Sequence, residues 1–310
     1  MKRLFTLVTI IVLAVISGNS IGACPRADIT GNCKVNLEDF AIMASEWLVE
    51  GIPEDPAVML WVSINDSGAG MKDSAGNPIN EGGFTGEMSK YETTNAQYCQ
   101  FLNEVLDSGD VVVDGNDING ADGPNTFWIY VGKRYYTLGG TGDTSDGATN
   151  GGATRISYNG ISFTVDIGFE NHPVTHVSWY GATVFCRFYN YRLPSEWEWQ
   201  AVADYDGSYI YGCGVSINYS IANCYRSTHP DGTTIVGNIE NASGYGYGVC
   251  DMAGNVWEWT RSLKNPASAQ IYRVIRGGSW SVNALTCTVS RRHTYLPYDT
   301  NNSIGFRVCR

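Results

Sequence analysis

Glycine is unusually frequent in this sequence, and that frequency limits how much regular structure the chain can form. There are 36 glycines among 310 residues, about 12% against a usual value of ~7%. Aromatic residues contribute another 12% and charged residues only 16%, a balance that excludes a disordered chain. Glycine permits turns and aromatic side chains fill a core. We therefore expect a folded α+β protein in which many turns and irregular connections join short elements.

The charge balance argues against one class of partner, the nucleic acids. The chain carries 31 acidic and 20 basic side chains, a formal net charge of −11. Nucleic-acid phosphates would be repelled by such a surface, so we expect no nucleic-acid partner. The length suits one large domain, or one large domain with a small appendage.

The first residues have the order of a secretory signal peptide. Lys2 and Arg3 precede an apolar run over residues 4–16, and small residues follow up to Ala23, the pattern of a segment removed on export. The run is shorter than the ~20 residues of a membrane-spanning helix. We predict a signal peptide over 1–23 and export to the periplasm, the cell surface or the medium. Residues 21–24 also fit a loose lipobox, which leaves open a lipid on Cys24 as the only membrane attachment.

Residues 24–49 predict a small module made of a calcium loop and a helix. Oxygen-bearing side chains occupy positions one, three, five, nine and twelve of a twelve-residue loop, and a lysine stands at position seven, where the backbone carbonyl serves. The five oxygen-bearing residues are, in order, Asp28, Thr30, Asn32, Asn36 and Asp39, and the lysine is Lys34. The loop resembles a single dockerin-type repeat. The alternative is a metal-free loop and helix closed by a Cys24–Cys33 disulfide. Residues 50–56, with two prolines and a glycine, are typical of a linker.

Three helices are expected in the domain that occupies residues 57–310. A capping box at Thr94–Gln97 starts the first helix, and apolar residues then recur at helical spacing. A second helix is expected within residues 178–190, where apolar side chains share one face. The third begins at the cap Ser195–Glu198 and should bury Trp199.

Strands should be short and concentrated before the second helix. Alternation predicts strands at 134–138 and 162–165, inside a hairpin-rich insertion over 107–170. No convincing helix is found after residue 205. This mixture of elements favours an α+β fold with long irregular connections.

Four segments, taken in order, carry a resemblance to a known family. They are Tyr91–Asn95 with Tyr98, His172–Trp199, Gly254–Trp259, and Arg276–Trp280 with Gly305–Arg307. Across about residues 57–310 they resemble the formylglycine-generating enzyme, or sulfatase-modifying factor, family. The resemblance implies a compact mixed α/β fold that is related to the C-type lectin fold and low in regular structure. No GxGxxG, GxxxxGK[ST], HExxH or GxSxG motif points to another activity.

The resemblance also implies two structural calcium ions. Each would take two side chains and two backbone carbonyls: Asp251, Glu258, Gly254 and Val256 for the first ion, and Asn223, Asp231, Cys224 and Thr233 for the second. Oxygen ligands of this kind are what calcium requires. The alternative for the first set is a charged turn beside a pair of tryptophans.

Catalysis in the family converts a sulfatase cysteine to formylglycine with molecular oxygen, using a Cu(I) ion held by two thiolates, which are soft ligands that suit this ion. Counted from Arg276, the second thiolate falls on Cys287 and the first on Val282, whereas Ser279 is retained. Valine offers no ligand, so a lone Cys287 cannot complete the site. The basic run 291–293 could lower a thiol pKa without replacing the sulfur. The alternative role of Cys287 is a buried thiol or a half-cystine.

Two hypotheses of different class follow. In the first, the chain is a non-catalytic binding or scaffold protein, stabilised by calcium, that presents the loop 281–303 to a protein or carbohydrate ligand. The side chains on or near that surface would be Trp280, Arg292, Tyr295 and Tyr298. In the second, the chain is an oxidase that acts on a sulfatase polypeptide through an altered metal site. Copper is expected as a cofactor only in the second case.

Disulfides are expected because nine cysteines in an exported chain meet an oxidising compartment. We predict at least two, of which Cys24–Cys33 is one. The family resemblance implies Cys186–Cys309 as the other, although Val308 displaces the terminal cysteine by one residue from the position that relatives use.

Overall fold

The computed structural model describes residues 58–123, 130–139, 153–224, 232–239 and 244–310. All of them belong to one unit, residues 52–310. The predicted signal peptide, calcium loop, linker and Cys24–Cys33 disulfide lie outside the described residues, and so does Asp231. Within the described part of the chain, no helix is long and apolar enough to cross a membrane.

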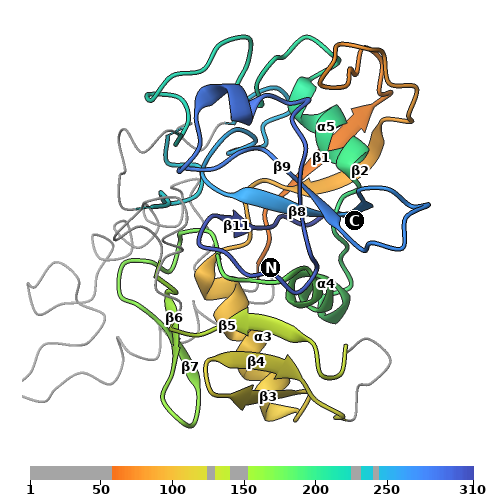
Figure 1. Ribbon diagram of the computed structural model, residues 1–310. Coiled ribbons are helices and arrows are strands. Elements are labelled where there is room, and N and C mark those ends of the chain that lie inside the picture. The colour runs from red at the N-terminus through yellow and green to blue at the C-terminus, as the bar shows by residue number, and fades with distance from the viewer. Residues whose placement is uncertain (1–57, 124–129, 140–152, 225–231, 240–243) are drawn as a thin grey trace, which may run out of the picture. The chain divides into compact units, whose positions relative to one another are not determined.

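The largest sheet places two of the family segments side by side (Figure 1). Its strand order is β10-β9-β8-β11, and the strands are His293–Tyr295, Arg273–Arg276, Trp257–Leu263 and Ile304–Gly305. Figure 1 labels β9, β8 and β11. β9 is antiparallel to both of its neighbours, whereas β11 runs parallel to β8. The parallel pair aligns Gly305 with Glu258, so the segments at 254–259 and 305–307 meet in the sheet.

The other sheets are short and antiparallel. β1 (Trp61–Asp66) pairs with β2 (Phe84–Ser89), β3 (Val111–Asp114) and β5 (Arg134–Thr137) flank β4 (Asp117–Gly120), and β6 (Ile156–Tyr158) pairs with β7 (Phe163–Val165). β5 and β7 confirm the strands expected at 134–138 and 162–165. β3 to β7 are the hairpins expected of the insertion.

Capping side chains explain where the helices begin. α3 (Asn95–Asp107) follows Thr94, whose Oγ1 accepts from the Gln97 amide at 3.3 Å, while the Gln97 side chain accepts from the Thr94 amide at 2.9 Å. Ser195 and Glu198 form the same capping box at α5 (Glu196–Asp204). Each box satisfies N–H groups that the first turn of a helix leaves unpaired.

The three expected helices are confirmed. α4 (Trp179–Phe188) has Ser178 as its N-cap, and Trp199 on α5 is fully buried. After residue 205, the described ranges contain a single helical turn, the 3-10 helix η2 (Ala284–Cys287).

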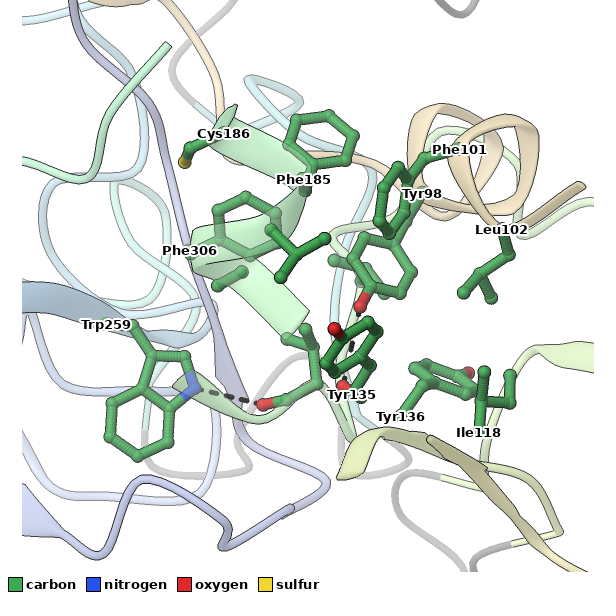
Figure 2. Packing of buried hydrophobic residues seen from close by; sticks show 14 of the residues in the cluster. Tyr98, Phe101, Leu102, Ile118, Tyr135, Tyr136, Phe185, Cys186, Trp259 and Phe306 are labelled. Carbon is green, nitrogen blue, oxygen red and sulfur yellow. Dashed lines mark hydrogen bonds between the residues drawn. The ribbon is translucent and has the colours of Figure 1, made fainter. Parts of the chain in front are cut away.

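An aromatic core joins α3 and α4 to the large sheet (Figure 2). The ring centroids of Phe185 on α4 and Phe306 lie 5.3 Å apart, and Tyr98 on α3 lies 5.9 Å from Phe185. Two of the buried polar ends have clear partners, since Trp259 Nε1 donates to the Val177 carbonyl at 2.9 Å and the Tyr98 hydroxyl donates to the Tyr135 carbonyl at 3.4 Å. Burial of aromatic rings whose polar atoms are satisfied is strongly stabilising.

The structure does not contain the disulfide implied for Cys186 and Cys309. Cys186 and Cys309 are both buried free thiols. The Cys309 Sγ donates to the Arg192 carbonyl at 3.5 Å, and the two backbones exchange hydrogen bonds. The two thiols are close enough to interact electrostatically, but the Cys309 Sγ is directed to the Arg192 carbonyl and is not bonded to Cys186.

Candidate functional site

A tight glycine turn leads from β9 into the loop that carries the expected active-site positions. Gly277 and Gly278 have φ values of 96° and 78°, a region that favours glycine. A Cβ atom on Gly278 would lie 2.4 Å from the Cys287 Sγ, so only glycine lets Cys287 approach the turn this closely. Ser279 is buried, and its hydroxyl is hydrogen-bonded to that of Ser281 at 3.1 Å.

Cys287 is not the lone sulfur that the sequence predicted. It is fully buried in an apolar cluster with Cys213, Cys224, Ala222 and Ala253. The thiols of Cys287 and Cys224 are hydrogen-bonded to each other, and Cys213 is near enough to act on Cys287 electrostatically. Cys224 was expected to offer only a backbone carbonyl, and the spacing of these cysteines along the sequence gives no sign that they meet.

The thiol environment disfavours a Cys287 thiolate. The hydrogen bond to Cys224, and then burial, raise the pKa of Cys287 well above its ordinary value, while the same hydrogen bond lowers the pKa of Cys224. The basic run 291–293 does not reverse this effect. Arg292 is engaged by Glu196, to which its Nε and Nη2 donate at 2.5 and 2.7 Å.

Val282 fills the position at which the family has its first thiolate. Its side chain is half-buried and packs against the cysteine cluster. Its amide donates to the Ser279 carbonyl at 3.2 Å, which closes the turn before η2. The position is therefore part of the apolar packing, and the sulfur that interacts with Cys287 is that of Cys224, from another segment of the chain.

The residues expected on or near a ligand surface differ in exposure. Trp280 is fully buried, and its Nε1 donates to the Asn302 carbonyl at 3.4 Å, so it lies beneath the surface. Arg292 and Tyr295 are half-buried. Tyr298 is 48% exposed and is the member of this set that is most available for contact.

The first calcium set is built around a buried ion pair. Glu258 accepts from Arg307 Nε at 2.7 Å and Nη2 at 2.8 Å, and from Trp199 Nε1 at 2.7 Å. The side chains of Glu258 and Arg307 are 0% exposed. Asp251 accepts from the Gly237 amide at 2.5 Å. Both oxygens of Glu258 already receive donors, so this carboxylate does not fit a cation as placed.

The second calcium set contains an unused oxygen. Asn223 is 1% exposed, and its Nδ2 donates to the Gly232 carbonyl at 3.2 Å and to Asn255 Oδ1 at 3.3 Å. Its Oδ1 has no hydrogen-bond partner among the residues that the structure describes. Buried acceptors are normally satisfied, and a side-chain amide oxygen is a ligand that calcium accepts. The residues around Asn223 therefore fit calcium better than those around Asp251.

Metal-ligating side chains do not form a cluster in the described part of the chain. Across the ranges that the structure describes, no three or more His, Cys, Asp or Glu side chains are arranged to hold a metal ion. This leaves the calcium set at Asn223 dependent on backbone carbonyls and on Asp231, which lies outside those ranges.

Glu92 is a buried residue whose role the sequence did not reveal, although it lies in the first family segment. Its Oε2 accepts from Asn255 Nδ2 at 2.6 Å and its Oε1 from the Val256 amide at 3.1 Å. Burial, with Asp251 and Glu258 nearby, raises the pKa of Glu92 well above its ordinary value. Asn255, at φ 55°, accepts in turn from the Thr234 amide at 2.9 Å. The network fixes the turn that leads into β8.

The sequence matches a family model over residues 68–310, which is most of its length, and that model is described as the sulfatase-modifying factor enzyme 1-like domain. The chain belongs to this family. The matched range contains the four segments that carried the resemblance, so the family prediction is confirmed.

Relatives of this sulfatase-modifying factor domain have different roles. The serine/threonine-protein kinase pkn1 of Chlamydia pneumoniae is 33% identical over 173 residues, which are 51% of this chain and 27% of the kinase. The inactive C-alpha-formylglycine-generating enzyme 2 of Mus musculus is 33% identical over 149 residues, 44% of this chain and 48% of that protein. The formylglycine-generating enzyme of Streptomyces coelicolor is 29% identical over 166 residues, which are 45% of this chain and 53% of that enzyme. This chain spans about half or less of each relative, and one of them is inactive, so membership does not determine catalysis.

A solved structure supports the fold. The crystal structure of CarF superposes with a TM-score of 0.55 at 19% identity, covering 82% of this chain and 98% of that chain. At such identity the likeness establishes the fold alone. It confirms the mixed α/β architecture with few helices that the family resemblance implied.

Proposed function

We propose that this chain is an exported, non-catalytic binding or scaffold member of the sulfatase-modifying factor family. The observation that carries the proposal is the burial of the sulfur atoms: Cys287 is 0% exposed and Cys224 is 1% exposed. An oxidase that acts on a cysteine of another polypeptide must bring the substrate thiol against its own reactive centre. Here that thiol would have to enter a closed apolar cluster, in which Val282 occupies the place of a ligand.

The binding surface is proposed on the loop 281–303. Leu285 on η2 is 77% exposed and Tyr298 is 48% exposed, and Arg292 and Tyr295 are half-buried beside them in sequence. Exposed apolar and aromatic side chains are typical of surfaces that bind another molecule. The ligand class we propose is a protein or a carbohydrate. Export is proposed from the order of the first 23 residues, with a lipid on Cys24 as the alternative to a soluble product.

A second candidate is an oxidase with a rearranged copper site, and the contact between Cys224 and Cys287 favours it. Two thiols form a donor set that Cu(I) accepts, so Cys224 could replace the sulfur that Val282 lacks. Cys224 and Cys287 would then hold the ion, and the ion would supply oxygen chemistry toward a sulfatase cysteine. Burial of both sulfurs argues against this candidate.

Titration of the reduced protein with Cu(I), against a competing chromophoric chelator, separates the two candidates. We expect no tight stoichiometric binding by the wild type, because a closed cluster must open before the sulfurs can bind metal. Val282→Cys should strengthen Cu(I) binding on the order of 10-fold or more if the loop keeps the family geometry. Tight wild-type binding that is lost in both Cys224→Ser and Cys287→Ser, but kept in Cys99→Ser, would favour the oxidase.

Calcium should raise the midpoint temperature of unfolding. A ligand at 100 times its Kd adds about 2.7 kcal/mol to the free energy of unfolding, because the unfolded chain has no such site. We expect Asn223→Ala to remove the calcium-dependent rise and Asp251→Asn to keep it, since the unused oxygen belongs to Asn223. Thermal scans in chelator and in excess calcium measure the difference for each variant. If Asp251→Asn alone removes the rise, the ion binds at the first set instead.

A further inference from the structure

Three buried thiols belong to one apolar cluster, and in the proposed binding function none of them has a chemical role. Cys213, Cys224 and Cys287 are 4%, 1% and 0% exposed. Cys213 and Cys224 precede β8, whereas Cys287 is the last residue of η2, after β9. A buried single thiol behaves as a small apolar side chain. Two thiols in contact from separate segments can instead be joined covalently.

Of these three thiols, Cys224 and Cys287 are in direct contact. They share a hydrogen bond, whereas the Cys213 Sγ donates to the Ser216 carbonyl at 3.8 Å.

We propose that Cys224 and Cys287 are joined by a disulfide when the protein folds under oxidising conditions, and that Cys213 stays a thiol. In the step, each thiol loses a proton and one sulfur–sulfur bond forms between them. Two electrons pass to a disulfide oxidant such as oxidised glutathione, whose own sulfur–sulfur bond breaks to give two thiols.

The crosslink would close a long loop of the chain. Cys224 and Cys287 are 63 positions apart in the sequence. A crosslink that closes a long loop restricts the unfolded chain more than one that closes a short loop. The native fold already holds the two thiols in contact, so the disulfide should form with little movement of the backbone. For a domain of this size we expect oxidation to raise the midpoint temperature by about 5–15 °C.

The crosslink would also fix the loop on which binding is proposed. η2 carries the exposed Leu285 and ends at Cys287, so the disulfide would anchor this turn to the segment that ends at Cys224. A binding loop that is already fixed loses less conformational entropy when it binds. This consequence rests on the proposed function, but the crosslink itself does not.

Peptide mapping of the protein refolded in glutathione redox buffers tests the pairing. Free thiols are alkylated without reduction, the protein is digested, and crosslinked peptides are identified by mass spectrometry. We expect one crosslinked pair that contains Cys224 and Cys287, in the wild type and in Cys99→Ser. Cys99 is a suitable control because it is a buried thiol on α3 whose Sγ contacts Asn103. Cys224→Ser and Cys287→Ser should lose both the crosslinked pair and the thermal rise on oxidation.

Two outcomes would overturn the inference. One is alkylation of both Cys224 and Cys287 in the most oxidising buffer, and the other is a crosslink between Cys287 and Cys213. If the serine variants do not fold, the wild-type peptide map decides the question alone. The Cu(I) titration uses reduced protein, so failure of the crosslink and failure of the proposed function can be told apart.

Discussion

Replacing Arg307 with methionine should reduce the free energy of unfolding by about 3–5 kcal/mol, because one partner of a fully buried ion pair would be left alone. The Arg307 guanidinium donates twice to Glu258, and its Nη2 also donates to the Cys250 carbonyl at 2.8 Å. Typical domains are stable by only about 5–15 kcal/mol. The variant should therefore be marginally folded at best.

The size of this effect comes from the carboxylates that Arg307 faces. Glu92, Asp251 and Glu258 are all buried, and burial raises the pKa of Asp251 to about 6. The Arg307 charge opposes this rise in both Glu92 and Asp251. Without it, negative groups remain together in a region that water does not reach, and that desolvation cost exceeds the loss of one attractive pair.

Arg310→Met is the matched control. Its Nε lies 2.7 Å from Glu87 Oε2, the same separation as in the buried pair, but the two side chains are 46% and 37% exposed. We expect a loss of about 1 kcal/mol or less, since water screens exposed pairs. Urea unfolding of both variants measures the comparison. Equal losses would show that burial is not what makes Arg307 important.

The parts of the fold that local sequence determines were predicted well. The capping residues at Thr94 and Ser195 define where α3 and α5 begin, because each helix start depends on side chains within three positions of the cap. The alternation of apolar and polar residues predicted β5 and β7, because it too is a property of residues next to one another in the sequence. The family segments then supplied the overall architecture, which periodicity alone does not give.

Contacts between distant segments could not be read from the sequence. Glu92 and Asn255 are 163 positions apart, and their hydrogen bond connects two family segments through the core. The contact of Cys224 with Cys287 is of the same kind. Nothing in the residues flanking either cysteine indicates the pairing, because a thiol is equally suited to apolar packing, metal binding and disulfide formation.

Glu258 shows a second reason for the limits of prediction. The family resemblance implied a calcium ligand at this position, and in the structure both of its oxygens accept from Arg307. A carboxylate accepts either a cation or a guanidinium. Which one it receives depends on the parallel pairing of β11 with β8, which brings the segment of Arg307 to Glu258.

The prediction with the largest effect on activity is that this protein does not oxidise a sulfatase peptide. We expect the reduced protein, supplied with Cu(I) and oxygen, to leave a cysteine-containing sulfatase peptide unchanged relative to a copper-only control. The sulfur atoms of Cys287 and Cys224 lie inside the apolar cluster, and Val282 offers no ligand at the remaining position. A substrate thiol therefore has no accessible centre at which to react, and the rate should not rise above that of copper alone.

Mass spectrometry of that peptide tests the non-catalytic reading most directly. The reaction is followed with the wild type, with Cys287→Ser and with Cys99→Ser, under identical copper and oxygen. We predict only the unmodified cysteine peptide in all three, within the background of the copper control. Formation of the aldehyde peptide by the wild type and by Cys99→Ser, but not by Cys287→Ser, would contradict the binding-protein account and establish an oxidase.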